Sequence, residues 1–199
     1  MLRALAAENV PLVGLDPSMT LTYRSEYKAL GADRVPKVQL LQEWLAGQLD
    51  RRHPTSATAG QEGFFLLPHC TERANAAGSL GDWQRIFRRL RLELSVLPSG
   101  CCGMAGTYGH EARHRATSER IYALSWKEKV AAHGQSGRLL ATGYSCRSQA
   151  KLVDGIKLLH PAQALLSHLQ RPVVAEAAAS RDRAPRNGSR RERSMEAHG

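Results

Sequence analysis

Short apolar segments alternate with amphipathic segments along this chain, and the alternation limits the folds that it can adopt. Apolar runs of about four to six residues bounded by turn formers are typical of buried β-strands. Strands that alternate with helices pair in parallel, because the returning chain crosses over the sheet. The sequence therefore predicts an α/β layered domain with a small, mostly parallel sheet flanked by helices, its strands falling at Pro11–Leu15, Phe64–Leu67, Leu92–Leu97 and Leu139–Gly143.

Helical periodicity and capping signals predict the helices between these strands. Ser79 with Asp82 resembles a capping box and predicts a helix start, as does Ser125 with Glu128. Pro161 predicts the start of the last helix, with His160 as its cap. The predicted apolar faces are Tyr23, Tyr27 and Leu30 before a terminating Gly31; Val38, Leu41, Trp44, Leu45 and Leu49; Trp83, Ile86, Phe87 and Leu90, opposite an exposed Arg85, Arg88 and Arg89; and Leu165, Leu166 and Leu169.

Size and composition favour one folded domain with a polar end. A chain of 199 residues with 42% hydrophobic content can close a single core. We expect this domain to span residues 1–174, with an irregular segment at Arg51–Gly63. Residues 175–199 are rich in Ala, Arg, Ser and Gly, so they are expected to form a disordered basic tail.

The net charge of +10 raises the question of a nucleic-acid partner. The positive charge is spread over the chain, without a basic stripe interleaved with aromatic residues, so specific nucleic-acid binding is not expected. No apolar run approaches the roughly 20 residues that span a bilayer, and the opening residues lack a long apolar signal region. A cytoplasmic protein without a membrane span is expected.

The four cysteines form one pattern with none left over: Cys70, the adjacent pair Cys101 and Cys102, and Cys146. Adjacent cysteines rarely bridge to each other, but both sulfurs can face one multinuclear centre. Each position follows a predicted strand, and the carboxyl ends of parallel strands meet at the ligand-binding edge of a sheet. Glycines after the pair would let backbone amides donate to an anionic cluster, which makes Gly103, Gly106 and Gly109 candidate cofactor-binding residues.

Other interpretations of these residues remain open. Single buried cysteines often only pack as small hydrophobes. Four thiolates also suit a tetrahedral zinc ion, although no short CxxC pair is present, and a redox disulfide would normally show the same CxxC spacing. The run HEARH from His110 to His114 matches a zinc-protease helix by its letters.

The run CCGMAGTYGHE from Cys101, with HCTE around Cys70 and TGYSCRSQ around Cys146, resembles the cysteine-rich CCG domain. That domain occurs in heterodisulfide reductases and in the iron–sulfur subunit of glycolate oxidase. The longer runs LDPSMTLTYRSEYKAL, ATGYSCRSQAKLVDG and HPAQALL resemble the C-terminal end of bacterial FAD-linked, iron–sulfur D-2-hydroxyacid dehydrogenases of the D-2-hydroxyglutarate type.

The resemblance implies electron transfer through a 4Fe-4S type cluster held by Cys70, Cys101, Cys102 and Cys146. FAD would lie on an upstream flavin-containing dehydrogenase domain or partner subunit. The family pattern ends in CxxC, whereas this chain has Gln149 at the last position, so both cubane and non-cubane clusters stay open. Ser18 and Met19 stand where an earlier half-repeat carries a cysteine, and that half is expected to be structural. The alternatives are a zinc- or thiol-containing interaction module, and a fragment truncated at its N-terminus that holds no cluster.

Overall fold

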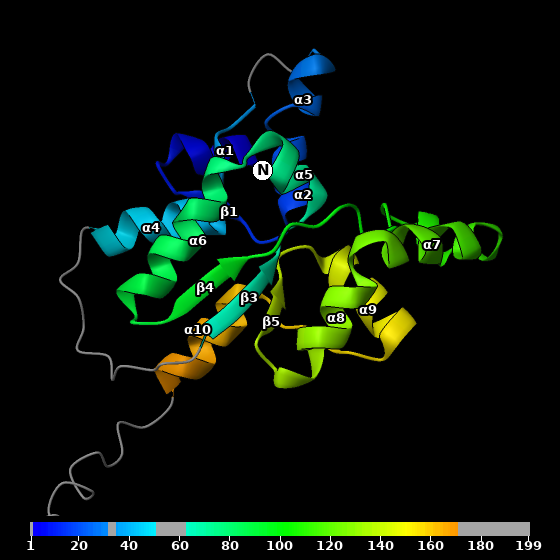
Figure 1. Ribbon diagram of the computed structural model, residues 1–199. Helices are drawn as coiled ribbons and strands as arrows, with labels where there is room; N and C mark the ends of the chain where they lie inside the picture. The colour runs from blue at the N-terminus through cyan, green and yellow to red at the C-terminus, as the bar shows by residue number, and fades with distance from the viewer. Residues whose placement is uncertain (1, 32–34, 51–62, 171–199) are drawn as a thin grey trace, which may run out of the picture.

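The computed structural model describes residues 2–31, 35–50 and 63–170, so the expected irregular segment (except Gly63) and the expected tail lie outside the described residues. A three-stranded parallel sheet in the order β4-β3-β5 forms the centre (Figure 1). The strands are β1 (Leu12–Gly14), β2 (Val38–Leu40), β3 (Gly63–Leu67), β4 (Glu93–Val96) and β5 (Leu139–Ala141). The helices are α1 (Leu2–Ala7), α2 (Pro17–Thr22), α3 (Glu26–Ala29), α4 (Leu41–Asp50), α5 (Cys70–Asn75), α6 (Gly78–Arg89), α7 (Arg115–Ser125), α8 (Lys127–His133), α9 (Tyr144–Asp154) and α10 (Pro161–Gln170), with the 3₁₀ helices η1 (Tyr108–His110), η2 (Ala112–His114) and η3 (Gly134–Ser136).

Alternate residues of the central sheet face two helical layers, because successive side chains of a strand point to opposite faces. Phe64 and Leu66 of β3 pack in a cluster with α4, α6 and α10. Phe65 and Leu67 face the other cluster, built from α7, α8 and α9. The sheet is therefore the middle layer of an α/β/α arrangement, which confirms the predicted fold class (Figure 1).

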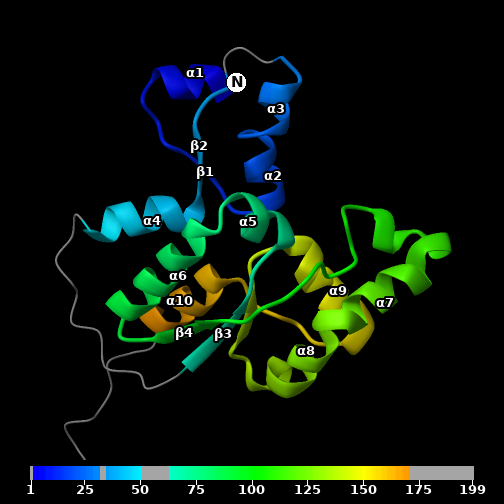
Figure 2. The same cartoon turned by 45° about the horizontal axis from the view of Figure 1, so that its top comes forward.

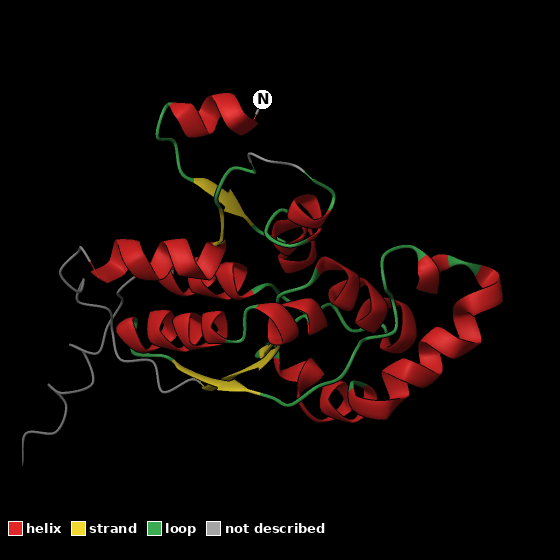
Figure 3. Ribbon diagram, turned by 90° about the horizontal axis from the view of Figure 1, so that it is seen from above, coloured by secondary structure: helices red, strands yellow, loops and turns green. Residues whose placement is uncertain are grey.

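The residues before α4 form a smaller unit around a second parallel sheet, in which Leu12 pairs with Val38 and Gly14 with Leu40. Gly14 has to be glycine, since a Cβ there would lie 1.8 Å from the Thr20 hydroxyl oxygen. This unit packs on the rest of the molecule through α2 against α5 (Figure 2). Viewed from above, the two sheets are separate and helices surround both (Figure 3).

All four predicted strands are present, and the fifth, β2, was missed. Val38 belongs to this strand instead of the predicted helix, whose remaining positions lie in α4. The predicted helical face at Tyr23, Tyr27 and Leu30 was also partly wrong. The chain there breaks between α2 and α3, although Gly31 ends α3 with a φ of +77° as expected.

The core face of α6 was predicted correctly, whereas two capping predictions were wrong. Trp83, Ile86, Phe87 and Leu90 are buried, and Arg85, Arg88 and Arg89 are exposed. Ser79 lies inside α6 with a buried hydroxyl, and Ser125 is the last residue of α7, so neither starts a helix. Pro161 does begin α10, and His160 caps it by accepting a hydrogen bond from the Ala162 amide at 3.2 Å.

Candidate metal centre

All four cysteines lie at the carboxyl ends of the central strands. Cys70 begins α5 after β3, Cys101 and Cys102 lie in the loop after β4, and Cys146 is the third residue of α9 after β5. Because β3 stands between β4 and β5, the chain leaves neighbouring strands in opposite directions at this edge. Such a switch in strand order opens a crevice, the usual ligand site of α/β sheets.

The thiols form a connected row in which Cys101 carries the negative charge. Hydrogen bonds from Cys102 and Cys70 hold the pKa of the Cys101 thiol well below its usual value. Hydrogen bonding to Cys101, together with burial, raises the pKa of Cys70. Bonds to Cys101 and Cys146 raise the pKa of Cys102 in the same way. All four sulfurs are free of disulfides.

A cavity of about 580 Å³ opens on one side of this row. Cys70 and Cys101 are partly exposed and line the cavity, while Cys102 and Cys146 are buried behind them. The remaining lining residues are Asp16, Ser18, Met19, His69, Thr71, Ala105, Gly106, Tyr144 and Ser145. The unit before α4 therefore contributes to the site, which its sequence did not indicate.

The three candidate glycines occupy different places. The Gly103 amide donates to Cys101 Sγ at 3.3 Å, and a Cβ at this position, whose φ is +86°, would lie 2.2 Å from the Ser118 carbonyl oxygen. Gly106 lines the cavity with a φ of +66°. Gly109 donates its amide to the Met104 carbonyl at 2.9 Å and packs against that residue, away from the sulfurs.

Two polar networks that the sequence did not reveal support the loops that carry the thiols. Buried Glu72 accepts hydrogen bonds from Thr142 at 2.6 Å and Gln42 at 2.7 Å, and burial raises its pKa to about 7. Gln149, at the position of the absent fifth cysteine, donates to the Ser118 hydroxyl at 2.8 Å. Ser118 in turn donates to the Gly103 carbonyl at 2.8 Å, so Gln149 braces the glycine loop.

The HEARH run does not form a zinc-protease helix. His110 ends η1 and His114 ends η2, and Glu111 between them is extended with a φ of −76° and a ψ of 127°. His114 instead stacks on Tyr108, with ring centroids 4.0 Å apart. The i, i+4 placement of two imidazoles on one helical face is therefore lost.

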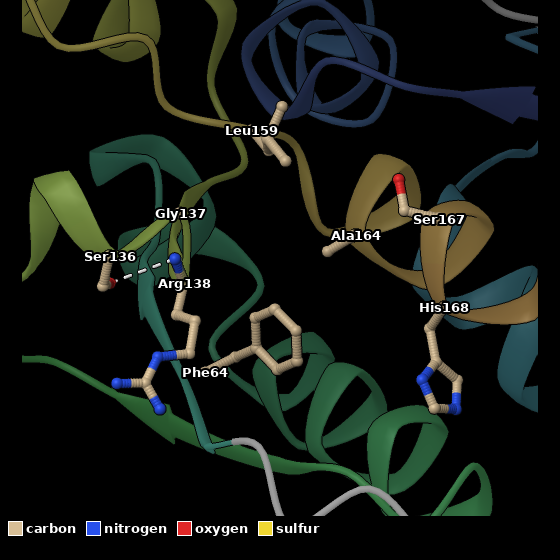
Figure 4. A pocket seen from close by; sticks show the side chains of 8 residues that line it. All are labelled: Phe64, Ser136, Gly137, Arg138, Leu159, Ala164, Ser167 and His168. Atoms are coloured by element: carbon tan, nitrogen blue, oxygen red, sulfur yellow. Dashed lines mark hydrogen bonds between the residues drawn. The ribbon is translucent and has the colours of Figure 1, made fainter. Parts of the chain in front are cut away.

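A second cavity, of about 360 Å³, lies at the opposite end of the sheet (Figure 4). Phe64 and Arg138, which line it, lie at the amino-terminal ends of β3 and β5. No cysteine borders it, so this cavity is separate from the thiol site.

The donor set suits a multinuclear cluster better than a single ion. Within residues 2–31, 35–50 and 63–170, no three His, Cys, Asp or Glu side chains surround one point as ligands of one metal ion. A row of four sulfurs, one of them a stabilised thiolate with an amide donor, matches the thiolate ligation that iron–sulfur clusters use. In the same ranges no helix is long and apolar enough to cross a membrane.

Comparison with known proteins gives a consistent set of relatives. The chain is 49% identical over 171 residues to D-2-hydroxyglutarate dehydrogenase of Pseudomonas putida, covering 85% of this chain and 16% of that protein. It is 46% identical over 167 residues to the Escherichia coli enzyme of the same name, covering 83% and 16%. One subunit of the Escherichia coli anaerobic glycerol-3-phosphate dehydrogenase is 26% identical over 167 residues, covering 79% and 40%.

No protein-family model matches the chain, and neither does any solved structure. The chain spans about a sixth of the length of the D-2-hydroxyglutarate dehydrogenases that it matches. Over most of its own length, this chain is thus similar to one part of D-2-hydroxyglutarate dehydrogenases.

Proposed function

We propose that the chain is an iron–sulfur electron-transfer domain of a cytoplasmic, FAD-linked 2-hydroxyacid dehydrogenase system, relaying electrons from flavin to an acceptor. The observation that carries this proposal is the row of four free thiols at the switch in strand order, with Cys101 held as a thiolate. The similarity to part of D-2-hydroxyglutarate dehydrogenase supports it.

Cys70, Cys101, Cys102 and Cys146 would hold the cluster, which would supply one-electron redox chemistry. The Gly103 amide stabilises negative charge on Cys101. Burial of Cys102 and Cys146 keeps water from one side, while Cys70 and Cys101 face the cavity from which a redox partner would approach. Hydride removal from a 2-hydroxyacid would take place on a flavin-containing domain or subunit, because that step needs an organic cofactor.

Two alternatives predict other contents of the same site. A non-catalytic zinc module would hold one zinc ion, and a truncated fragment would hold no metal. The row of sulfurs favours the cluster over zinc, since a structural zinc ion needs four donors around one point.

Anaerobic purification with iron, sulfide and zinc analysis tests the proposal. We expect brown protein that contains iron and labile sulfide in similar amounts. Cys146→Ser should lose most of the iron, whereas Ser148→Ala on the same helix should keep it. Colourless protein with stoichiometric zinc, or metal-free protein after reconstitution with iron and sulfide, would refute it.

A further inference from the structure

Asp16 connects the unit before α4 to the thiol site. Its Oδ1 accepts the Ser18 amide at 3.0 Å and the Met19 amide at 3.4 Å, which caps α2. Its second oxygen, Oδ2, accepts the Tyr144 amide at 2.9 Å, from a residue 128 positions away. One carboxylate thus serves the first turns of two helices.

Helix α9 needs this outside partner. The first four amides of a helix lack intrahelical acceptors, and a side chain just before the helix usually accepts one. Gly143 holds that place in α9 and makes no side-chain cap. It cannot be enlarged, because a Cβ there would lie 2.4 Å from the His69 ring and 3.0 Å from Cys146 Sγ. The close approach of His69 and Cys146 therefore removes the local cap.

We propose that Asp16 is a positioning residue for Cys146, capping α9 from the other unit and so holding the buried end of the thiol row in place. Cys146 is the third residue of α9, so its sulfur moves with the first turn. Burial opposes charge on Asp16, but hydrogen bonds from Ser18, Tyr144 and Met19 outweigh it and hold the pKa of the carboxyl below its usual value. The carboxylate is therefore charged at neutral pH, as favours a helix N-terminus. The inference rests on the proposed function only for its consequence, since the contact exists without a cluster.

Asp16→Ser separates the two roles of this residue. Serine caps its own helix about as well as aspartate but has no second oxygen for the Tyr144 amide. In the reduced, metal-free 199-residue chain, we expect Cys146 to be alkylated by iodoacetamide roughly tenfold faster relative to Cys70, as suits the loss of a bond to a charged acceptor. Ser18→Ala, which removes only a donor to Oδ1, should leave that ratio unchanged.

An unchanged ratio in Asp16→Ser would overturn the inference. If that variant does not fold, amide hydrogen exchange of the unaltered chain decides instead. We expect the Tyr144 amide to exchange roughly tenfold more slowly than amides in the first turn of α7, whose start has no side-chain cap. Equal exchange would also refute the role of Asp16. Neither measurement depends on iron or sulfide content, so the inference and the proposed function can fail separately.

Discussion

Burial sets the protonation of residues that support the thiol site. His160 is 8% exposed, accepts the Ala162 amide at the start of α10, and meets the Trp83 ring edge-on with centroids 5.6 Å apart. Burial, with a smaller contribution from Arg147, lowers the pKa of His160 from 6.5 to about 4. Glu72 shifts the other way, since its burial favours the protonated acid. Both residues are therefore neutral in the folded protein over part of the mildly acidic range.

We expect His160 to make stability depend on pH. Because its folded pKa is below its unfolded pKa, its contribution is complete above pH 6.5 and is lost as the pH falls toward about 4. The loss should reach about 2 to 3 kcal/mol between about pH 7 and pH 4.5.

Urea unfolding of His160→Asn against the unaltered chain measures this contribution, because asparagine keeps a capping oxygen but does not titrate. Glu72 contributes with the opposite sign in both proteins and cancels in the comparison. Identical pH dependence of the two proteins would contradict the burial argument.

Among the elements, the loop after β4 and the helices around the cavity depend on glycines at close approaches. Gly103 and Gly106 both have left-handed backbones, with φ of +86° and +66°. They differ in their surroundings, because a Cβ at Gly103 would meet the Ser118 carbonyl, whereas nothing lies within 4 Å of a Cβ at Gly106. The same loop therefore offers a strained glycine position with a clash and one without.

Gly103→Ala should lower stability more than Gly106→Ala. Both variants carry a left-handed alanine, which costs about 1 to 2 kcal/mol. Gly103→Ala must also displace α7 from the loop, so we expect at least twice the loss of unfolding free energy and a lower iron content. Denaturant unfolding and iron analysis of both variants check this, and equal losses would show that the loop yields without cost.

At the scale of the whole molecule, the thiol site combines two units. Cys70, Cys101, Cys102 and Cys146 come from the central sheet, and Asp16 and Met19 come from the unit around β1 and β2. The site opens through a cavity of about 580 Å³ to the surface. This arrangement suits a relay, in which electrons enter and leave while no organic substrate is transformed.

We expect the purified 199-residue chain not to oxidise D-2-hydroxyglutarate, D-lactate or glycolate with a dye acceptor. Activity should appear once a flavin-containing partner polypeptide is added. Cys101→Ser should then stop electron flow to the dye but leave flavin reduction intact, while Ser148→Ala should support both steps. Turnover by the chain alone would show that our division of labour is wrong.

A further prediction concerns residues 176–199, which lie outside the described ranges. Their sequence is polar and lacks periodic apolar positions, so it offers little surface to bury. Deleting them should leave the melting temperature nearly unchanged, as measured by calorimetry. A large decrease would show that these residues contact the folded part.

The sequence by itself determined the strands, the buried face of α6 and the place of the cysteines, because these follow from local apolar periodicity and from the geometry of parallel strands. It could not predict β2, since Val38 and Leu40 fit a strand only when β1 lies beside them. Nor could it give the roles of Ser79, Gln149 and Asp16. Those depend on hydrogen bonds to residues 7 to 128 positions away, which no local pattern encodes. Only the tertiary structure decided which partners satisfy these buried and half-buried polar groups, because each must find its partner wherever the folded chain brings one.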